Sequence, residues 1–140
     1  MKQITFVLVL FCLRVVAFGQ NADADKILGT YATEGNKGKI VIKKSGNKYN
    51  GTLTWTHIAD ATDKNNPDKT KRNNKLVGTE IVKDFIYAGN HVWEKGNVYD
   101  PESGKTYSGK ISLNKDGNLD VRGFVGISAF GRTTVWTREK

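Results

Sequence analysis

The side chains of this chain that could do chemistry are aromatic and basic residues spread over short alternating runs. Arg122 is expected on the same strand face as Asp120, so it could address a carboxylate ligand inside the fold or form a cross-strand surface pair. The aromatic rings offer flat apolar surface to a small apolar or amphipathic molecule. The candidate ligand-binding residues are therefore Trp55, Trp93, Tyr99, Tyr107, Arg122 and Trp136.

No nucleophile, acid–base pair or phosphate loop is complete. Gly104-Lys-Thr106 has the end of a phosphate-binding loop, but Tyr99 stands where that motif begins with glycine, and no helix is predicted after it. Ser128 lacks the glycine spacing of a nucleophile elbow. Asp100 precedes a proline, which is typical of a turn-capping residue. We assign no catalytic residue, and the sequence favours a protein that is not an enzyme.

Metal ligands are sparse. The chain has two histidines and one cysteine, Cys12, which lies in the N-terminal apolar run. A zinc site would therefore need carboxylate ligands. Asp60, Asp63 and Asp68 offer oxygen atoms that suit calcium, but neighbouring lysines oppose a dication. We expect neither a metal nor a cofactor.

Short runs of β-branched and aromatic residues, separated by Gly, Asn and Asp, predict an all-β fold. In the third run, Gly51, Leu53 and Trp55 are expected on one face. Eight regularly spaced strands favour a single antiparallel up-and-down barrel, just wide enough to be filled by side chains or to hold one small ligand. The predicted strands are residues 29–34, 39–44, 49–57, 79–85, 91–99, 106–113, 119–125 and 132–138.

One connection, residues 59–78, is long and polar. Loops of this length are uncommon inside compact domains and are often functional or mobile. The loop mixes acidic and basic residues between Asp60 and Lys75. It is therefore a candidate interaction surface.

The N-terminus has the pattern of an export signal, with a basic start, the apolar run Ile4–Phe18 and small residues at its exit. The run is shorter than the roughly 20 residues of a membrane span, and Arg14 interrupts it. We expect a signal peptide at residues 1–19, cleaved near Gly19. The mature domain at residues 20–140 would then lie in the periplasm or outside the cell, without a transmembrane span.

The net charge of the whole chain is +8. Without Lys2 and Arg14, 20 basic residues remain against 14 acidic ones. Such an excess favours polyanions, but the lysines are spread over strands and turns. Export also argues against nucleic acid, so we expect no nucleic-acid partner. The mature chain has no cysteine, so packing must stabilise it.

Short motifs are spread over nearly the whole predicted domain. They are Gly29-Thr-Tyr31, Asn66-Pro-Asp68, Arg72-Asn73, Leu76-Val-Gly78, Tyr99-Asp-Pro-Glu-Ser-Gly-Lys-Thr-Tyr107, Val121-Arg-Gly123 and Gly131-Arg-Thr-Thr-Val-Trp-Thr-Arg138. As a set they resemble the DUF2147 family of small exported bacterial proteins with a lipocalin-like barrel. The resemblance implies a barrel and an envelope setting. It implies no established reaction.

The resemblance also implies a structural lock. In lipocalin-like folds a late arginine covers an aromatic residue near the N-terminus, a cation–π contact of about 0.5–2 kcal/mol. The residues that match are Tyr31 with Arg132 or Arg138. Tyr31 stands where such a fold more often has tryptophan, which implies a smaller plug.

Two functions follow from these observations. The first is binding of a small apolar or carboxylate-bearing ligand inside the barrel of an exported monomer. The alternative is an envelope interaction module that acts through its outer surface and the 59–78 loop, with no internal ligand. The interior volume of the barrel decides between them.

Overall fold

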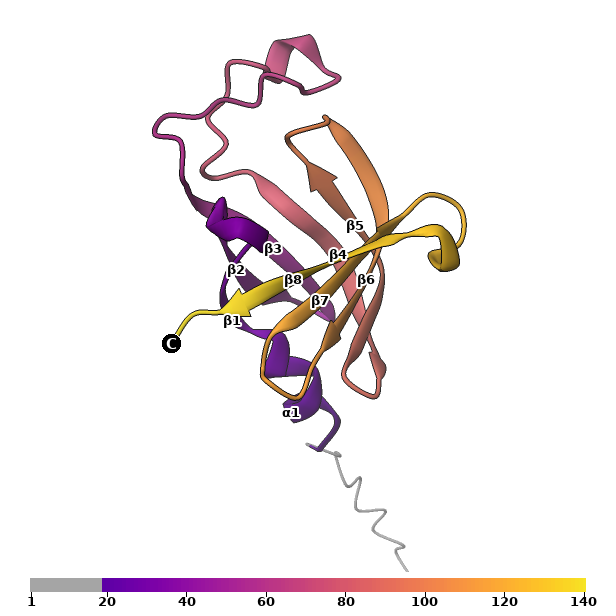
Figure 1. Ribbon diagram of the computed structural model, residues 1–140. Coiled ribbons are helices and arrows are strands. Elements are labelled where there is room, and N and C mark those ends of the chain that lie inside the picture. Colours follow the sequence, from indigo (N-terminus) through magenta and orange to yellow (C-terminus); the bar gives the residue numbers. More distant parts are fainter. Residues whose placement is uncertain (1–18) are drawn as a thin grey trace, which may run out of the picture.

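The structure, a computed structural model, describes residues 19–140, with side chains from residue 22 onward. The expected signal peptide lies outside the described residues except for Gly19. Each strand pairs antiparallel with the next, and β8 returns to β1, so the predicted eight-stranded up-and-down barrel is confirmed (Figure 1). The strands are β1 (Gly29–Ala32), β2 (Gly38–Ser45), β3 (Lys48–Thr56), β4 (Glu80–Gly89), β5 (Val92–Asp100), β6 (Lys105–Leu113), β7 (Leu119–Phe124) and β8 (Arg132–Arg138).

Short helical segments lie at the two ends of the barrel. α1 (Gly19–Ala24) and η1 (Asp25–Ile27) lie at one end, here called the helix end. The other end, here called the mouth end, carries four connections, residues 33–37, 57–79, 101–104 and 125–131. Three of them contain a single 3-10 turn, namely η2 (Glu34–Asn36), η3 (Lys69–Lys71) and η4 (Ser128–Phe130). Among residues 19–140, no helix combines the length and the apolar character needed to cross a membrane.

β-Bulges decide which side chains enter the barrel. In β3 the register shifts so that Lys39 pairs with Trp55 while Ile40 pairs with Leu53, which leaves one extra residue and turns Trp55 outward. The expectation that Trp55 shares a face with Leu53 is therefore wrong. In β4 a left-handed residue, Asp84 (φ 60°), marks a similar shift, and the strand continues past the predicted end.

Side chains fill the interior from Trp93 near the helix end to Val82 and Leu53 nearer the mouth end. Glycines make this possible, because a Cβ on Gly96 or Gly109 would overlap the ring of Phe85. A Cβ on Gly51 would likewise crowd the side chains of neighbouring strands. The largest fully buried side chains are Trp93, Tyr31, Tyr49, Phe85, Ile27, Ile40, Ile111, Leu119 and Val82.

The N-terminal segment closes the helix end by hydrogen bonding to aromatic residues of the barrel. The hydroxyl of Tyr31 donates to the Ile27 carbonyl at 2.8 Å, and the indole N–H of Trp93 donates to the Ala24 carbonyl at 3.2 Å. Burial raises the pKa of Tyr31 to about 12. The hydroxyl of Tyr49 donates to Asp25 at 2.6 Å, and this bond lowers the pKa of Asp25. Each buried polar group thus has a partner.

Arg138 connects this N-terminal segment to the last strand, β8. Its guanidinium carbon lies 4.8 Å from the centre of the Tyr31 ring. The same group donates to the carbonyls of Leu28 at 2.9 Å, Lys26 at 2.5 Å and Gly117 at 3.1 Å. Arg138 therefore makes the aromatic contact implied by the resemblance.

Arg132, the other residue considered for the lock, lies far from Tyr31. It pairs with Glu34 at 3.3 Å, and its side chain is 82% exposed. Its position follows from the strand: it begins β8 at the mouth end, whereas Tyr31 pairs with the last residue of β8. The assignment of Arg132 to the lock is wrong.

We predict that Arg138→Ala lowers the free energy of unfolding by about 2–4 kcal/mol, because it removes the cation–π contact and three charge-assisted hydrogen bonds. Arg138→Lys should recover only part of this, since lysine lacks the planar fork. Urea denaturation measures the change. Arg132→Ala is the matched control and should stay within about 0.5 kcal/mol. Equal effects at the two positions would contradict the assignment of the lock.

Candidate functional site

Three of the six candidate ligand-binding residues face the barrel interior. Trp93 is fully buried and Trp136 is 6% exposed, so both belong to the packed core. Tyr107 pairs with Val98 nearer the mouth end, and it lies against Gly123 of β7. Of the three, only Tyr107 is part-exposed.

The other three lie on the outside of the barrel. Trp55 is 40% exposed, with the Lys39 ammonium 5.7 Å from its ring centre. Tyr99 follows the inward-facing Val98, so strand alternation places it on the outer side. Arg122 lies between two inward positions of β7 and is also outward. The six residues therefore do not line one pocket.

The guanidinium of Arg122 donates hydrogen bonds to the β7–β8 connection and to β8, and not to Asp120. It donates to the carbonyls of Ser128 at 2.6 Å and Ala129 at 3.3 Å, and to the Thr133 hydroxyl at 2.8 Å. These bonds fix the connection between β7 and β8. The hypothesis that Arg122 is an interior charge is wrong, because two inward residues flank it on the strand.

Two open hollows lie on the outer surface of β5–β8, and both include Lys110 and Ser128. One extends over Glu94 and Lys95, and the other over Asp120. Because cations and carboxylates alternate there, neither hollow presents a single sign of charge.

The strongest constellation of polar groups lies at the mouth end, in the β3–β4 loop (residues 57–79). Among the described side chains, Asp63 is the one charged residue that is buried, at 4% exposure. Its two carboxylate oxygens accept from the Tyr99 hydroxyl at 2.6 Å and from the Asn66 amide at 2.8 Å. Burial raises the pKa of Tyr99, and the hydrogen bond to Asp63 adds to the effect. A buried carboxylate with two donors fixes the loop against β5.

Hydrogen bonds within the loop also stabilise its conformation. Its two arms pair through an isolated bridge between Thr62 and Lys75, with further backbone bonds on either side. The Arg72 guanidinium donates to the Asn66 carbonyl at 2.8 Å. Asp68 caps η3 by accepting from Thr70, and these bonds lower the pKa of Asp68. The loop is thus an ordered structure with its own hydrogen-bond network.

A second contact ties the loop to the turn between β5 and β6 (residues 101–104). The Asn65 amide donates to the carbonyls of Pro101 at 3.2 Å and Glu102 at 2.8 Å. A Cβ on Gly104, which has φ +71°, would overlap the Asn65 carbonyl, so only glycine fits there. Lys37 then pairs with Glu102 at 2.9 Å. We call residues 57–79 together with 101–104 the mouth platform.

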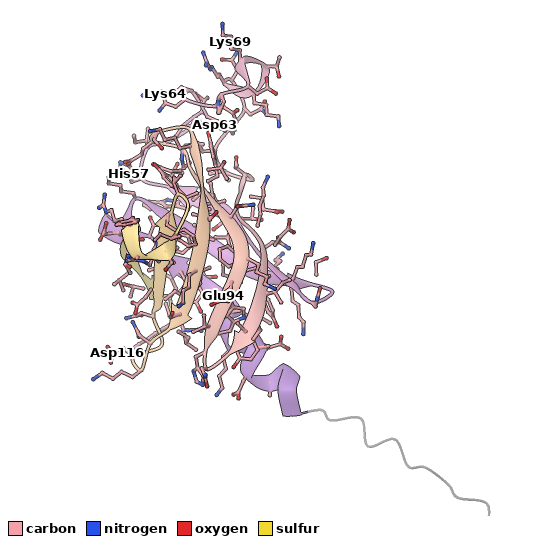
Figure 2. The ribbon with its side chains drawn as sticks, turned by 90° about the vertical axis from the view of Figure 1, so that its right-hand side faces the viewer. His57, Asp63, Lys64, Lys69, Glu94 and Asp116 are labelled. Carbon is pink, nitrogen blue, oxygen red and sulfur yellow. The ribbon has the colours of Figure 1, made fainter. Side chains whose placement is uncertain are left out.

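The exposed tip of the mouth platform is basic. Lys64, Lys69 and Lys71 are exposed, and in the described part of the chain none of them forms an ion pair with a carboxylate. Figure 2 shows Lys64 and Lys69 pointing away from the barrel, with Asp63 beneath them (Figure 2). Of the acidic side chains in the loop, Asp63 is buried, while Asp60 and Asp68 stay exposed. Between residues 64 and 71 the exposed surface therefore carries three lysines against the single carboxylate of Asp68.

The carboxylates that could suit calcium do not converge. Asp63 and Asp68 are occupied by hydrogen-bond donors, and Asp60 pairs with Lys75 at 3.3 Å. Within residues 22–140, no three histidine, cysteine, aspartate or glutamate side chains are grouped to hold a metal ion.

Sequence reasoning missed the role of Asp63. The loop was singled out by its length and charge, but the partner of Asp63 is 36 residues away on another strand. The available signal was the resemblance to the family in the motifs Asn66-Pro-Asp68, Arg72-Asn73 and Tyr99–Tyr107. The structure brings all three segments to the mouth end.

We predict that Tyr99→Phe costs about 1–3 kcal/mol, because it leaves a buried oxygen of Asp63 without its donor. Tyr107→Phe is the control, since in the described chain its hydroxyl has no hydrogen-bond partner and its loss should matter little. Hydrogen exchange should accelerate across residues 61–76 in Tyr99→Phe alone. Unchanged exchange in that loop would contradict the role of Asp63 as its anchor.

Comparison with known proteins agrees with this geometry at the level of the fold. Residues 29–138 match a family described as an uncharacterized protein conserved in bacteria, DUF2147. Among solved structures, the chain is similar to protein HP1028 from the human pathogen Helicobacter pylori, which is described as belonging to the lipocalin family. The two share 22% identity over 81% of this chain and 83% of that one, with a TM-score of 0.74. At that identity the likeness shows a lipocalin-like fold alone.

No curated protein matches the chain. The family match spans most of the sequence, from the first strand to the last. This chain is therefore a member of the DUF2147 family with a lipocalin-like barrel.

Proposed function

We propose that this protein is an exported interaction module that binds an acidic surface of a partner through its mouth platform. The single observation that carries the proposal is the buried Asp63, which accepts hydrogen bonds from Tyr99 and Asn66 and so holds a long polar loop in one conformation. The N-terminal basic start and apolar run support export.

Preorganisation supports a binding role for the loop. A flexible loop would lose conformational freedom on binding, whereas this one is already ordered by its network. The contacts of Asn65 with Pro101 and Glu102 add a second anchor. A partner would therefore meet a surface of fixed shape.

The charge of the tip supports an acidic partner. Lys64, Lys69 and Lys71 are exposed, and Asp68 is the one exposed carboxylate between residues 64 and 71. Complementary charges speed association and reject partners of the wrong sign. The packed interior of the barrel, by contrast, offers an internal ligand little room.

The test is site-specific photo-crosslinking in the cells that make the protein. A photoreactive residue at Asn73, which is exposed in the loop, should capture a partner, and the same residue at Lys115 of the helix end should not. The triple variant Lys64→Glu, Lys69→Glu, Lys71→Glu should lower the yield from position 73 by about tenfold or more, because the attraction becomes repulsion.

The matched control reverses three exposed lysines elsewhere, Lys43, Lys83 and Lys115, so the net charge changes equally. It should leave the yield unchanged. A yield that falls equally in both triple variants would show that net charge alone causes the loss, and would refute binding through the mouth platform.

The cleavage of the signal peptide has its own test. The first residue found by N-terminal sequencing of the mature protein should lie near Gln20, and an intact N-terminus would refute cleavage.

A second candidate function is binding of a small apolar or amphipathic ligand near the barrel mouth. It is favoured by the inward-facing Val98, Tyr107 and Thr134 of β5, β6 and β8, which are only part-buried, whereas Val82 beside Val98 is fully buried. A ligand there would lie above the packed core and be reached from the mouth end.

A panel of fatty acids tests this candidate. The protein should gain thermal stability and show adducts in native mass spectrometry, and Thr134→Phe, which fills the mouth, should abolish both. Thr137→Phe on the outer face is the control and should bind as the wild type does. No adduct with any fatty acid would refute the candidate.

A further inference from the structure

The connection between β7 and β8 exposes more apolar surface than any other turn among the described residues. Val125 is 76% exposed, Ile127 is 58% exposed and Phe130 is 83% exposed. Exposed side chains of this size normally occur singly, and a group of them marks an interaction site. Neither the mouth platform nor the barrel interior uses these residues.

The connection is an ordered turn that hydrogen bonds hold in place. Arg122 donates to two of its carbonyls, at Ser128 and Ala129, and backbone bonds from Phe130 and Gly131 close the turn η4. Gly131 packs closely on β7, since a Cβ there would lie 2.7 Å from the Gly123 carbonyl. The chain thus fixes a turn whose apolar side chains point to solvent.

The connection is apolar in the middle and has one arginine at each end. From Gly123 to Gly131 no residue is charged, and Arg122 and Arg132 stand on either side. Lys95 and Lys110 line the hollow beside Ser128, against the single carboxylate of Glu94 in that hollow. Segments that enter a membrane interface combine an apolar centre with flanking cations that stay at the headgroups.

The shape of the connection also matters. In Figure 1 it projects outward from the wall of the barrel, on the side away from the β3–β4 loop. A projecting turn presents its apolar tip to a flat surface, whereas the core of a protein interface is usually a closely fitted patch.

We propose that residues 124–131 dock the protein on an anionic lipid surface. Val125, Ile127 and Phe130 enter the interface between headgroups and acyl chains. Lys95 and Lys110 meet the lipid phosphates, and Arg122 is a positioning residue that keeps the turn in shape. This inference does not depend on the mouth platform, which is formed by two other connections of the mouth end.

The test is co-sedimentation of the purified mature protein, residues 20–140, with vesicles of phosphatidylglycerol and phosphatidylethanolamine. The wild type should bind these vesicles, bind pure phosphatidylcholine vesicles at least tenfold more weakly, and lose affinity as salt rises. The double variant Ile127→Ser, Phe130→Ser should bind at least tenfold more weakly than the wild type.

The matched control is Ile58→Ser, Val77→Ser, which removes two apolar residues that are 58% and 48% exposed at the base of the β3–β4 loop. It should bind as the wild type does. In Phe130→Trp the new indole fluorescence should shift to the blue on anionic vesicles and be quenched by brominated acyl chains. This variant keeps the turn intact and tests insertion directly.

Arg122→Lys keeps the positive charge but loses the planar guanidinium that donates to two carbonyls. It therefore separates the effect of Arg122 on the shape of the turn from its charge attraction to lipid. It should speed hydrogen exchange in residues 125–131 and weaken vesicle binding, with no change in salt dependence. No vesicle binding by the wild type would overturn the proposal. A dimer in sedimentation that Phe130→Ser dissociates would also overturn it, since a second copy would then cover the turn.

Discussion

The contact between Arg138 and the N-terminal segment is the constraint on which the rest of the structure depends. β1 has four residues and pairs with β8 at only two positions, so this seam has the fewest backbone bonds of the barrel. Arg138 strengthens it by covering Tyr31 and binding the carbonyls of Lys26 and Leu28. Gly29 allows this approach, because at φ +145° a Cβ would lie 2.7 Å from the guanidinium. The motifs at the two ends of the domain, one with Gly29 and Tyr31 and the other with Arg138, therefore meet in this one contact.

Closing the helix end with aromatic residues has a consequence for function. The bonds from Tyr31 and Trp93 to the segment before β1 pull that segment into the barrel end, and the bulky rings fill the space above it. A barrel of eight strands has little width to spare. The features left for recognition are at the mouth end. They are an ordered polar loop and an apolar turn, each held by a buried or hydrogen-bonded side chain that is not itself the recognition surface.

The strands were predictable because alternation of side chains between two environments leaves a period of two in the sequence. That period fails at bulges. Trp55 was expected inside because it stands two residues from Leu53, and a single extra residue in the pairing turned it out. Arg122 shows a different limit. Arg122 and Asp120 stand two residues apart, which puts both side chains on one face of the strand, but only the closed barrel decides which face is outside. The hydrogen bonds from Arg122 to Ser128 and Ala129 depend on a turn whose path no local pattern indicates.

By itself, the sequence determined the number and order of the strands and the barrel, because these follow from local periodicity. The residue types of the lock were implied by the family resemblance. Only the tertiary structure decided that Arg138 and not Arg132 covers Tyr31, that the interior is packed near the helix end, and that Asp63 anchors the long loop. The reason is physical. Each of these depends on a distance between residues far apart in the chain, which is set by strand register and barrel closure.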